Sequence, residues 1–192
     1  MKSIAIYGAG GFGKEVRGLL NHPGFNSYSF VGFLDDDATI NPMAKEGSYE
    51  DIVVAIANCT DRKRVVDKLD SRFTFEKIIH PAIYLDSSVE IKKGSILCDG
   101  VKLTVDISIG EFVIINLNAT IGHDTRLGKF VSIMPAVNIS GGVTIGDGTF
   151  IGSGATVLQG LTIGQHVTIG AGAVVTKNIP DHGIAKGIPA RF

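Results

Sequence analysis

The sequence predicts a small α/β domain followed by a parallel β-helix. The first observation is a series of seventeen aliphatic residues, each six positions after the last, that runs from Ile79 to Val175. The second is a short apolar segment at 3–7 that leads into the glycine-rich turn Gly8–Gly13 and then into a helical pattern. A helix repeats every 3.6 residues and an amphipathic strand every two. A fixed period of six instead indicates hexapeptides wound into a β-helix.

Each hexapeptide is expected to form one short strand and one turn, so that three hexapeptides complete a triangular coil. The aliphatic residue points into the coil, and successive coils stack about 4.8 Å apart. Three positions after the aliphatic residue, eleven of the seventeen hexapeptides carry Gly, Asn or Asp. These residue types tolerate the positive φ of a tight corner. The series therefore predicts nearly six coils.

The segment before the coils reads as a βαβ-type domain of about 75 residues. Thr60 is the expected cap of its second helix, and Asn41-Pro42 lies in its longest irregular stretch. The expected elements are strands at 3–7, 30–34, 51–57 and 75–79 and helices at 14–20 and 61–70. We expect domains at 1–78 and 79–180, followed by a tail at 181–192.

The glycine-rich turn has the strand–turn–helix context in which G-x-G-x-x-G binds a phosphate at a helix N-terminus. An acidic run, Asp35-Asp36-Asp37, follows about twenty residues later, the spacing of a group that holds a ribose. A whole NAD would hardly fit so small a domain. Alternatively, the glycines only permit a tight turn, and the acidic run is a solvated strand end. The candidate nucleotide-binding residues are Gly10, Gly11, Phe12, Gly13, Asp35 and Asp36.

One hexapeptide, 121–126, places a histidine where the repeat otherwise carries small or solvated residues. His123 is expected to point outward near a corner, with Asp124 at the turn position. Eighteen residues later, one coil on, comes Gly141, in the run Ser140-Gly141-Gly142 whose backbone is least covered by side chains. A base beside a bare amide suits acyl transfer from a thioester.

Two asparagines of the preceding hexapeptide, Asn116 and Asn118, are candidates for orienting a substrate by hydrogen bonds. They are equally compatible with ordinary turn positions. A zinc site would need three converging histidines, and His123 has no histidine five residues before it, so no metal is expected.

Composition narrows the remaining function classes. The net charge is −1 and no long Lys/Arg run occurs, so neither nucleic acid nor a membrane surface is an expected partner. The N-terminus lacks the apolar core of a signal peptide. Cys59 and Cys98 are too few for a disulfide framework. These observations favour a reducing, cytoplasmic location.

An apolar stripe on the outer surface of the coils predicts self-association. Such a stripe would be a large exposed patch on a monomer, so we expect it to be buried at a threefold interface that brings a neighbouring chain next to His123. Its members are Ile96, Phe112, Ile114, Phe130 and Phe150.

Together, the glycine-rich domain, Leu34-Asp35-Asp36, the Asn116 hexapeptide and Gly122-His123-Asp124 resemble one family over essentially the whole chain. This is the group of bacterial sugar acetyltransferases that contains bacillosamine-type N-acetyltransferases and sialic-acid O-acetyltransferases. The resemblance implies a left-handed β-helix, a homotrimer, and acetyl-CoA bound between subunits. It also implies that His123 is the general base, that Asp124 polarises its ring, and that the Gly141 N–H binds the acetyl carbonyl.

The same resemblance implies that the N-terminal domain binds the nucleotide of a sugar nucleotide. Further coenzyme contacts are implied at Gly142, Ala171, Gly187 and Pro189, the last two in a Gly-x-Pro-Ala tail that would otherwise only cap the final coil. Phe12 and Ser132 depart from the family, since many relatives carry histidine at the first and some at the second. These departures leave the sugar and the nucleotide open.

The implied activity is acetyl-CoA-dependent N-acetylation of an amino sugar, nucleotide-linked, in bacterial surface glycan biosynthesis. One alternative is O-acetylation of a sugar such as a sialic acid. Another is a non-catalytic scaffold that binds a sugar nucleotide.

Overall fold

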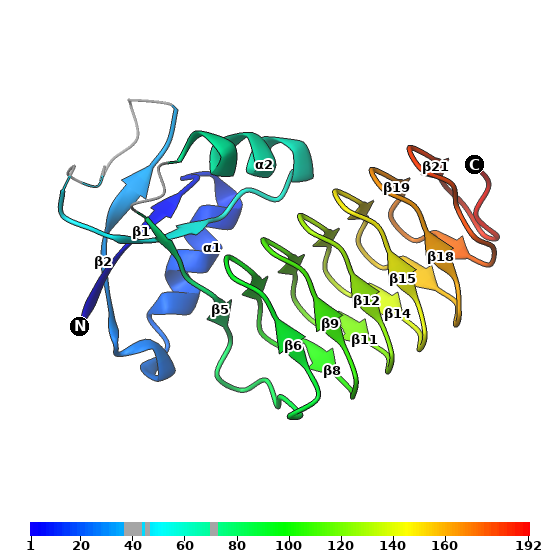
Figure 1. Cartoon of the computed structure of the whole chain (residues 1–192), viewed down its shortest axis with the longest axis horizontal. Helices are drawn as coiled ribbons and strands as arrows, with labels where there is room; N and C mark the ends of the chain where they lie inside the picture. The colour runs from blue at the N-terminus through cyan, green and yellow to red at the C-terminus, as the bar shows by residue number, and fades with distance from the viewer. Residues whose placement is uncertain (37–43, 45–46, 70–72) are drawn as a thin grey trace.

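The computed structural model describes residues 1–36, 44, 47–69 and 73–192 and consists of an α/β domain joined to a parallel β-helix (Figure 1). The expectations that fall on Asp37, Asn41-Pro42 and Asp70 lie outside these residues.

The α/β domain is built on a parallel sheet with the strand order β2-β1-β3-β4. Ile4 and Ile6 of β1 and Val53 of β3 are fully buried beneath the helices. The strands are β1 (Lys2–Tyr7), β2 (Tyr28–Leu34), β3 (Asp51–Val54) and β4 (Thr74–Phe75), and the helices are α1 (Gly11–Leu20), α2 (Cys59–Lys68) and the 3-10 turn η1 (Pro23–Phe25).

Several element boundaries differ from the prediction. The expected cap Thr60 is wrong: α2 begins at Cys59, and the side chain of Asn58 accepts the Asp61 N–H at 3.0 Å. The expected strand at 75–79 is two strands in different sheets, because Ile78 and Ile79 pair with the first full coil instead of with β3.

The β-helix consists of three parallel sheets whose strands pair at steps of eighteen residues, as the period of six predicts, except that β21 follows β19 at a step of sixteen. The first sheet contains β5 (Ile78–Ile79), β7 (Ile96–Leu97), β10 (Ile114–Ile115), β13 (Ser132–Ile133), β16 (Phe150–Ile151), β19 (Thr168–Ile169) and β21 (Ile184–Ala185). The second contains β8 (Lys102–Leu103), β11 (Thr120–Ile121), β14 (Asn138–Ile139), β17 (Thr156–Val157) and β20 (Val174–Val175). The third contains β6 (Glu90–Ile91), β9 (Ser108–Ile109), β12 (Arg126–Leu127), β15 (Thr144–Ile145) and β18 (Thr162–Ile163).

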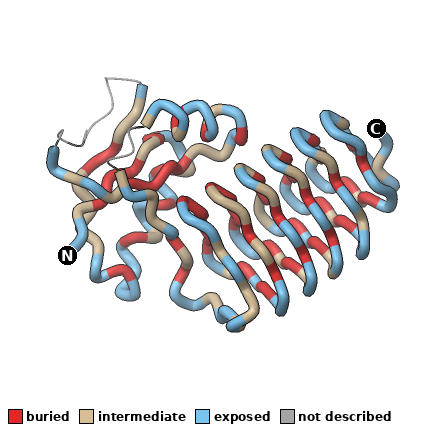
Figure 2. The backbone as a smooth tube through the Cα atoms, in the orientation of Figure 1, coloured by how far each residue is buried: buried red, intermediate tan, exposed pale blue. Residues whose placement is uncertain are grey.

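The interior of the coils is formed by the predicted aliphatic series. From Leu97 to Val175 every member of that series is buried, and the buried positions recur from coil to coil in Figure 2. Leu85 is an exception, with 39% of its surface exposed, because the segment that carries it forms no strand. The corners carry the expected positive φ at residues such as Asp124, and the same conformation also occurs at Phe130, which is not one of the residue types that favour it.

The two domains share a buried junction. Ile78, Ile96 and Ile114, on the outer face of the first sheet, have no exposed surface and belong to the same apolar cluster as the α/β domain. Phe112 is also buried and packs edge-on against Phe75 of β4 at 5.0 Å. The expectation that this stripe forms a threefold interface is therefore wrong for Ile96, Phe112 and Ile114, because the chain's own N-terminal domain covers them.

Candidate active site

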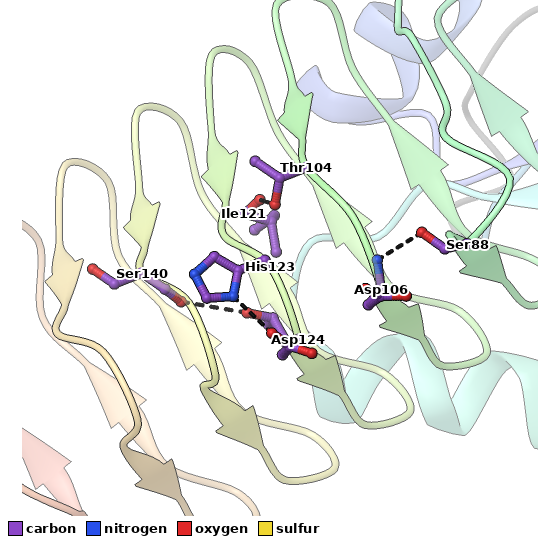
Figure 3. A network of polar contacts seen from close by, with 8 residues as sticks. Ser88, Thr104, Asp106, Ile121, His123, Asp124 and Ser140 are labelled. Carbon is purple, nitrogen blue, oxygen red and sulfur yellow. Dashed lines mark hydrogen bonds and ion pairs between the residues drawn. The ribbon is translucent and has the colours of Figure 1, made fainter.

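The candidate base, His123, lies at the corner that follows β11, and its side chain is 64% exposed. Its Nδ1 is 2.7 Å from Oδ2 of Asp124. The corner is held because the Asp124 N–H donates to the Val105 carbonyl of the preceding coil at 3.2 Å. Figure 3 shows the imidazole between its own coil and the coil that carries Ser140. The position of His123 in the repeat thus leaves its imidazole exposed at the surface of the coil, and Asp124 orients the ring.

The histidine ring lies directly over Gly141, as the eighteen-residue step predicts. A Cβ added to Gly141 would be 2.5 Å from Nε2 of His123 and 2.6 Å from its Cε1. Within the described part of the chain, the Gly141 N–H has no hydrogen-bond acceptor, whereas the Gly142 N–H donates to the His123 carbonyl at 2.7 Å. Of the two candidate amides, Gly141 is therefore the one that can serve a ligand.

A second candidate site is a cavity of about 480 Å³ at the carboxyl ends of β1, β2 and β3. The predicted residues Gly10, Gly11, Phe12, Asp35 and Asp36 all line it. The carboxyl end of a parallel sheet is where such folds bind nucleotides. Gly13 does not line this cavity, because it packs under the turn, where an added Cβ would overlap the Gly8 carbonyl oxygen.

The two acidic residues of this cavity have different surroundings. Asp35 accepts the Ala9 N–H at 2.8 Å and so holds the glycine-rich turn. Asp36 accepts the Tyr7 hydroxyl at 2.7 Å and lies 3.6 Å from the Lys68 ammonium; these contacts lower the pKa of the Asp36 carboxyl. Burial and the bond to Asp36 raise the pKa of Tyr7 to about 12, so Tyr7 stays protonated and donates.

Two other groups of predicted residues lie apart from His123. Asn116, Asn118 and Ala171 occupy corners that follow the first sheet, whereas His123 and Gly141 occupy corners that follow the second. Asn116 is buried and accepts the Leu117 N–H at 2.7 Å, and Asn118 has the φ of 56° typical of these turns.

The C-terminal tail closes the last coil. The Gly187 carbonyl accepts the Val174 N–H at 3.0 Å, and the Ala190 N–H donates to the Val174 carbonyl at 2.8 Å. Pro189, preceded by a cis peptide bond, lies between these contacts. The tail thus has the geometry of a cap on the last coil.

Sequence reasoning missed Arg62, which joins the domains. Its side chain is fully buried and donates to the carbonyls of Ile56 at 2.5 Å, Phe112 at 2.9 Å and Phe130 at 2.8 Å. It also donates to the Ser132 hydroxyl at 2.9 Å. Burial lowers the pKa of Arg62 to about 10, well above neutral pH. No local signal marks an arginine within the polar helix sequence CTDRKRVVDK for such a role.

Within residues 1–36, 44, 47–69 and 73–192, no group of three His, Cys, Asp or Glu side chains is placed to bind a metal ion. No helix of the described chain has the length and apolarity needed to span a bilayer.

Hexapeptide coils that present a histidine over a bare glycine amide define a hexapeptide-repeat acyltransferase. Family models support this class for both parts of the chain. The model described as bacterial transferase hexapeptide (six repeats) matches residues 124–159 and 142–177, and the PglD N-terminal domain model matches residues 3–69. A search of curated proteins returned no significant match.

Comparison with solved structures identifies a more specific family within this class of acyltransferases. A variant of perosamine N-acetyltransferase from Caulobacter crescentus, in complex with CoA and GDP-perosamine, is 31% identical with a TM-score of 0.93 over 100% of this chain and 96% of that one. The acetyltransferase domain of PglB from Neisseria gonorrhoeae FA1090, in complex with acetyl coenzyme A, is 32% identical with a TM-score of 0.89 over 99% and 98%. WeeI from Acinetobacter baumannii AYE is 32% identical with a TM-score of 0.81 over 100% and 99%. The chain belongs to this family of left-handed β-helix sugar acetyltransferases.

Proposed function

We propose that the protein is an acetyl-CoA-dependent N-acetyltransferase whose acceptor is a nucleotide-linked amino sugar. The observation that carries the proposal is the His123 ring, oriented by Asp124 and stacked over the free Gly141 amide. The choice of acetyl donor and acceptor is supported by two similar enzymes, one of which was solved with CoA and GDP-perosamine and the other with acetyl coenzyme A.

The mechanism follows from the two nitrogens of His123. Donation of the Nδ1 proton to Asp124 leaves Nε2 unprotonated, so that Nε2 accepts a proton from the sugar amine as the amine attacks the thioester carbon. The carbonyl oxygen becomes an oxyanion that accepts the Gly141 N–H. When the tetrahedral intermediate collapses, the C–S bond breaks, and the proton held by the imidazolium neutralises the departing CoA thiolate.

The N-terminal cavity is the proposed site of the nucleotide. Asp36 would accept a hydrogen bond from a ribose hydroxyl, because its lowered pKa keeps it ionised at neutral pH. The α1 N-terminus at Gly10 and Gly11 would face the phosphates. Phe12 offers an aromatic surface to either the base or the sugar.

We propose a homotrimer in which a neighbouring subunit completes the site. A catalytic histidine that is more than half exposed needs a wall that excludes water. Val105, one coil before His123, and Leu158, one coil after Ser140, present exposed apolar surface near it. Gly142 uses its N–H within the coil. Ala171 lies on another corner, and Gly187 and Pro189 lie in the C-terminal tail. We therefore propose that these four residues contact acetyl-CoA at a subunit boundary. The proposed location of the protein is the cytoplasm, where acetyl-CoA is made.

The test is a thiol-release assay with acetyl-CoA and a panel of UDP-, GDP- and dTDP-linked amino sugars. Each amino sugar is paired with the analogue that carries a hydroxyl in place of the amine. Turnover of an amine but not of its hydroxyl analogue, abolished by His123→Ala, is the expected result. Preference for the hydroxyl would favour O-acetylation. Nucleotide-sugar binding without binding of acetyl-CoA would instead favour a non-catalytic scaffold.

A further inference from the structure

Aromatic rings form a ladder along a different corner of the β-helix from the one that carries His123. The corner follows the third sheet, and its turn positions after β9, β12, β15 and β18 lie on successive coils (Figure 1). Phe112 and Phe130 stack with their ring centroids 5.1 Å apart and their planes 7° apart. Further along, His166 and His182 stack at 5.3 Å and 17°. The ladder therefore has two stacked pairs.

Gly148 occupies the turn position between these pairs. Its φ of 66° resembles the 57° of Phe130 and the 53° of His166. An aromatic residue thus adopts this corner conformation on both neighbouring coils, so the turn itself does not demand glycine. The ladder lacks a ring on this coil because residue 148 is glycine, which has no side chain.

A cavity of about 200 Å³ lies at the interruption and is lined by Phe130, Gly148 and His166. The two rings are two coils apart, or about 10 Å, and a ring between them needs about 7 to 8 Å. One planar ring fits in that space, and two do not. The volume agrees, since a cavity of roughly 150 Å³ can bind benzene, whereas drug-sized ligands occupy roughly 300 Å³ or more.

The charged side chains at the cavity bear on whether a neutral or a charged aromatic ligand would fit there. Lys63 and Lys129 are among the lining residues, together with Thr60 and Gln165. Lys63 is paired with Asp67 at 2.6 Å and Lys129 with Glu111 at 3.0 Å. Asp147, the carboxylate in the lining, accepts the backbone N–H of Lys129 at 2.8 Å and so faces the backbone of the preceding coil.

We propose that this cavity is a second ligand site, which binds a small planar aromatic carboxylate between Phe130 and His166 with its carboxylate toward Lys63 and Lys129. Stacking on both faces supplies the affinity. Each ammonium group has three N–H donors and shares itself with one carboxylate of the chain, so a ligand carboxylate can accept a remaining N–H, which a neutral ring of the same shape cannot do. The site lies on a different edge of the prism from His123 and Gly141, so a ligand there need not compete with the acetyl donor.

The test uses nicotinate and nicotinamide, which share a ring and differ in charge, as probes in ligand-observed NMR titrations of the full chain. Nicotinate is expected to bind in the millimolar range and at least about threefold more tightly than nicotinamide. Gly148→Phe places a covalent ring in the ladder once the His166 ring moves aside, because the added Cβ would otherwise lie 2.5 Å from its Nδ1. This variant is expected to weaken nicotinate binding by about tenfold or more. Gly154→Phe is the matched control, because Gly154 has a φ of 68° and open space around it on another corner.

A second variant keeps the proposal testable if Gly148→Phe folds poorly. Lys129→Gln leaves the ladder intact and is expected to weaken binding of nicotinate but not of nicotinamide. Absence of nicotinate binding at millimolar concentration, or equal binding by the Gly148→Phe and Gly154→Phe variants, would overturn the site. Equal affinity for the two probes would overturn the assignment of an anion. Acetyl transfer by the Gly148→Phe variant is expected to be normal, so these outcomes are independent of the proposed activity.

Discussion

Gly141→Ala is the substitution that most directly tests the geometry of the proposed site. The added methyl carbon would lie 2.5 Å from Nε2 of His123, which is about 0.9 Å short of ordinary van der Waals contact at 3.4 Å. The φ of Gly141 lies outside the positive region, so the backbone accepts alanine. Alanine also keeps the N–H that is proposed to bind the oxyanion. The change therefore displaces the base and leaves the amide in place.

The expected result is a fall in kcat of about a hundredfold, because a displacement near 1 Å of a catalytic group has an effect of that size. The assay is thiol release at saturating acetyl-CoA, and the KM for acetyl-CoA is expected to change little. Gly18→Ala, in open space on α1, is the control for a general effect of the added methyl group.

A double-mutant cycle with His123→Ala separates displacement of the ring from other effects. His123→Ala alone is expected to lower kcat by about a hundredfold or more. If Gly141→Ala acts through the ring, it adds less than about threefold in that background, because the two changes remove the same contribution. Independent, multiplying losses would refute the reasoning, as would normal activity of the Gly141→Ala enzyme.

Three further predictions concern the nucleotide cavity, the junction and the assembly. Asp36→Asn should raise the KM for the nucleotide sugar by about tenfold and leave the KM for acetyl-CoA unchanged; because the lowered pKa keeps Asp36 ionised, the wild-type KM should be flat from pH 6 to 8 in steady-state kinetics. Arg62→Ala should lower the free energy of unfolding in urea by about 3 kcal/mol or more, since several buried carbonyls lose their donor. The control is Arg64→Ala, at an exposed arginine paired with Asp61, which should change this free energy by less than about 0.5 kcal/mol. Equal effects of the two changes would show that the buried contacts do not stabilise the junction. Sedimentation velocity should show a trimer at micromolar concentration, and a monomer that retains full activity would remove the neighbouring subunit from the proposed site.

Much of the candidate site could be predicted because the β-helix converts sequence separation into distance. A step of eighteen residues is a step of one coil, so the placement of His123 over Gly141 follows from counting. The same rule gave the buried interior from Leu97 to Val175. In the N-terminal domain, the strand–turn–helix order brought Gly10, Gly11 and Asp36 to one edge of the sheet, because the carboxyl ends of parallel strands meet there.

Other features depended on how the two domains pack, which no local repeat encodes. Ile96 and Ile114 were correctly predicted to face outward, yet their partner is the α/β domain of the same chain instead of a second subunit. Arg62 looks like a solvated helix residue until the coil corners at Phe112 and Phe130 supply carbonyls for it. Asn58, not Thr60, caps α2, because only the fold decides which of two nearby polar residues adopts the extended backbone of a cap.

The sequence alone therefore determined the coil, its register and the meeting of base and amide, since all three follow from a strict six-residue period. Only the tertiary structure decided which outer face the N-terminal domain covers, where the buried arginine binds, and which of the glycine amides is free. Those features arise from contacts between segments far apart in the chain, whose relative positions a one-dimensional period does not specify.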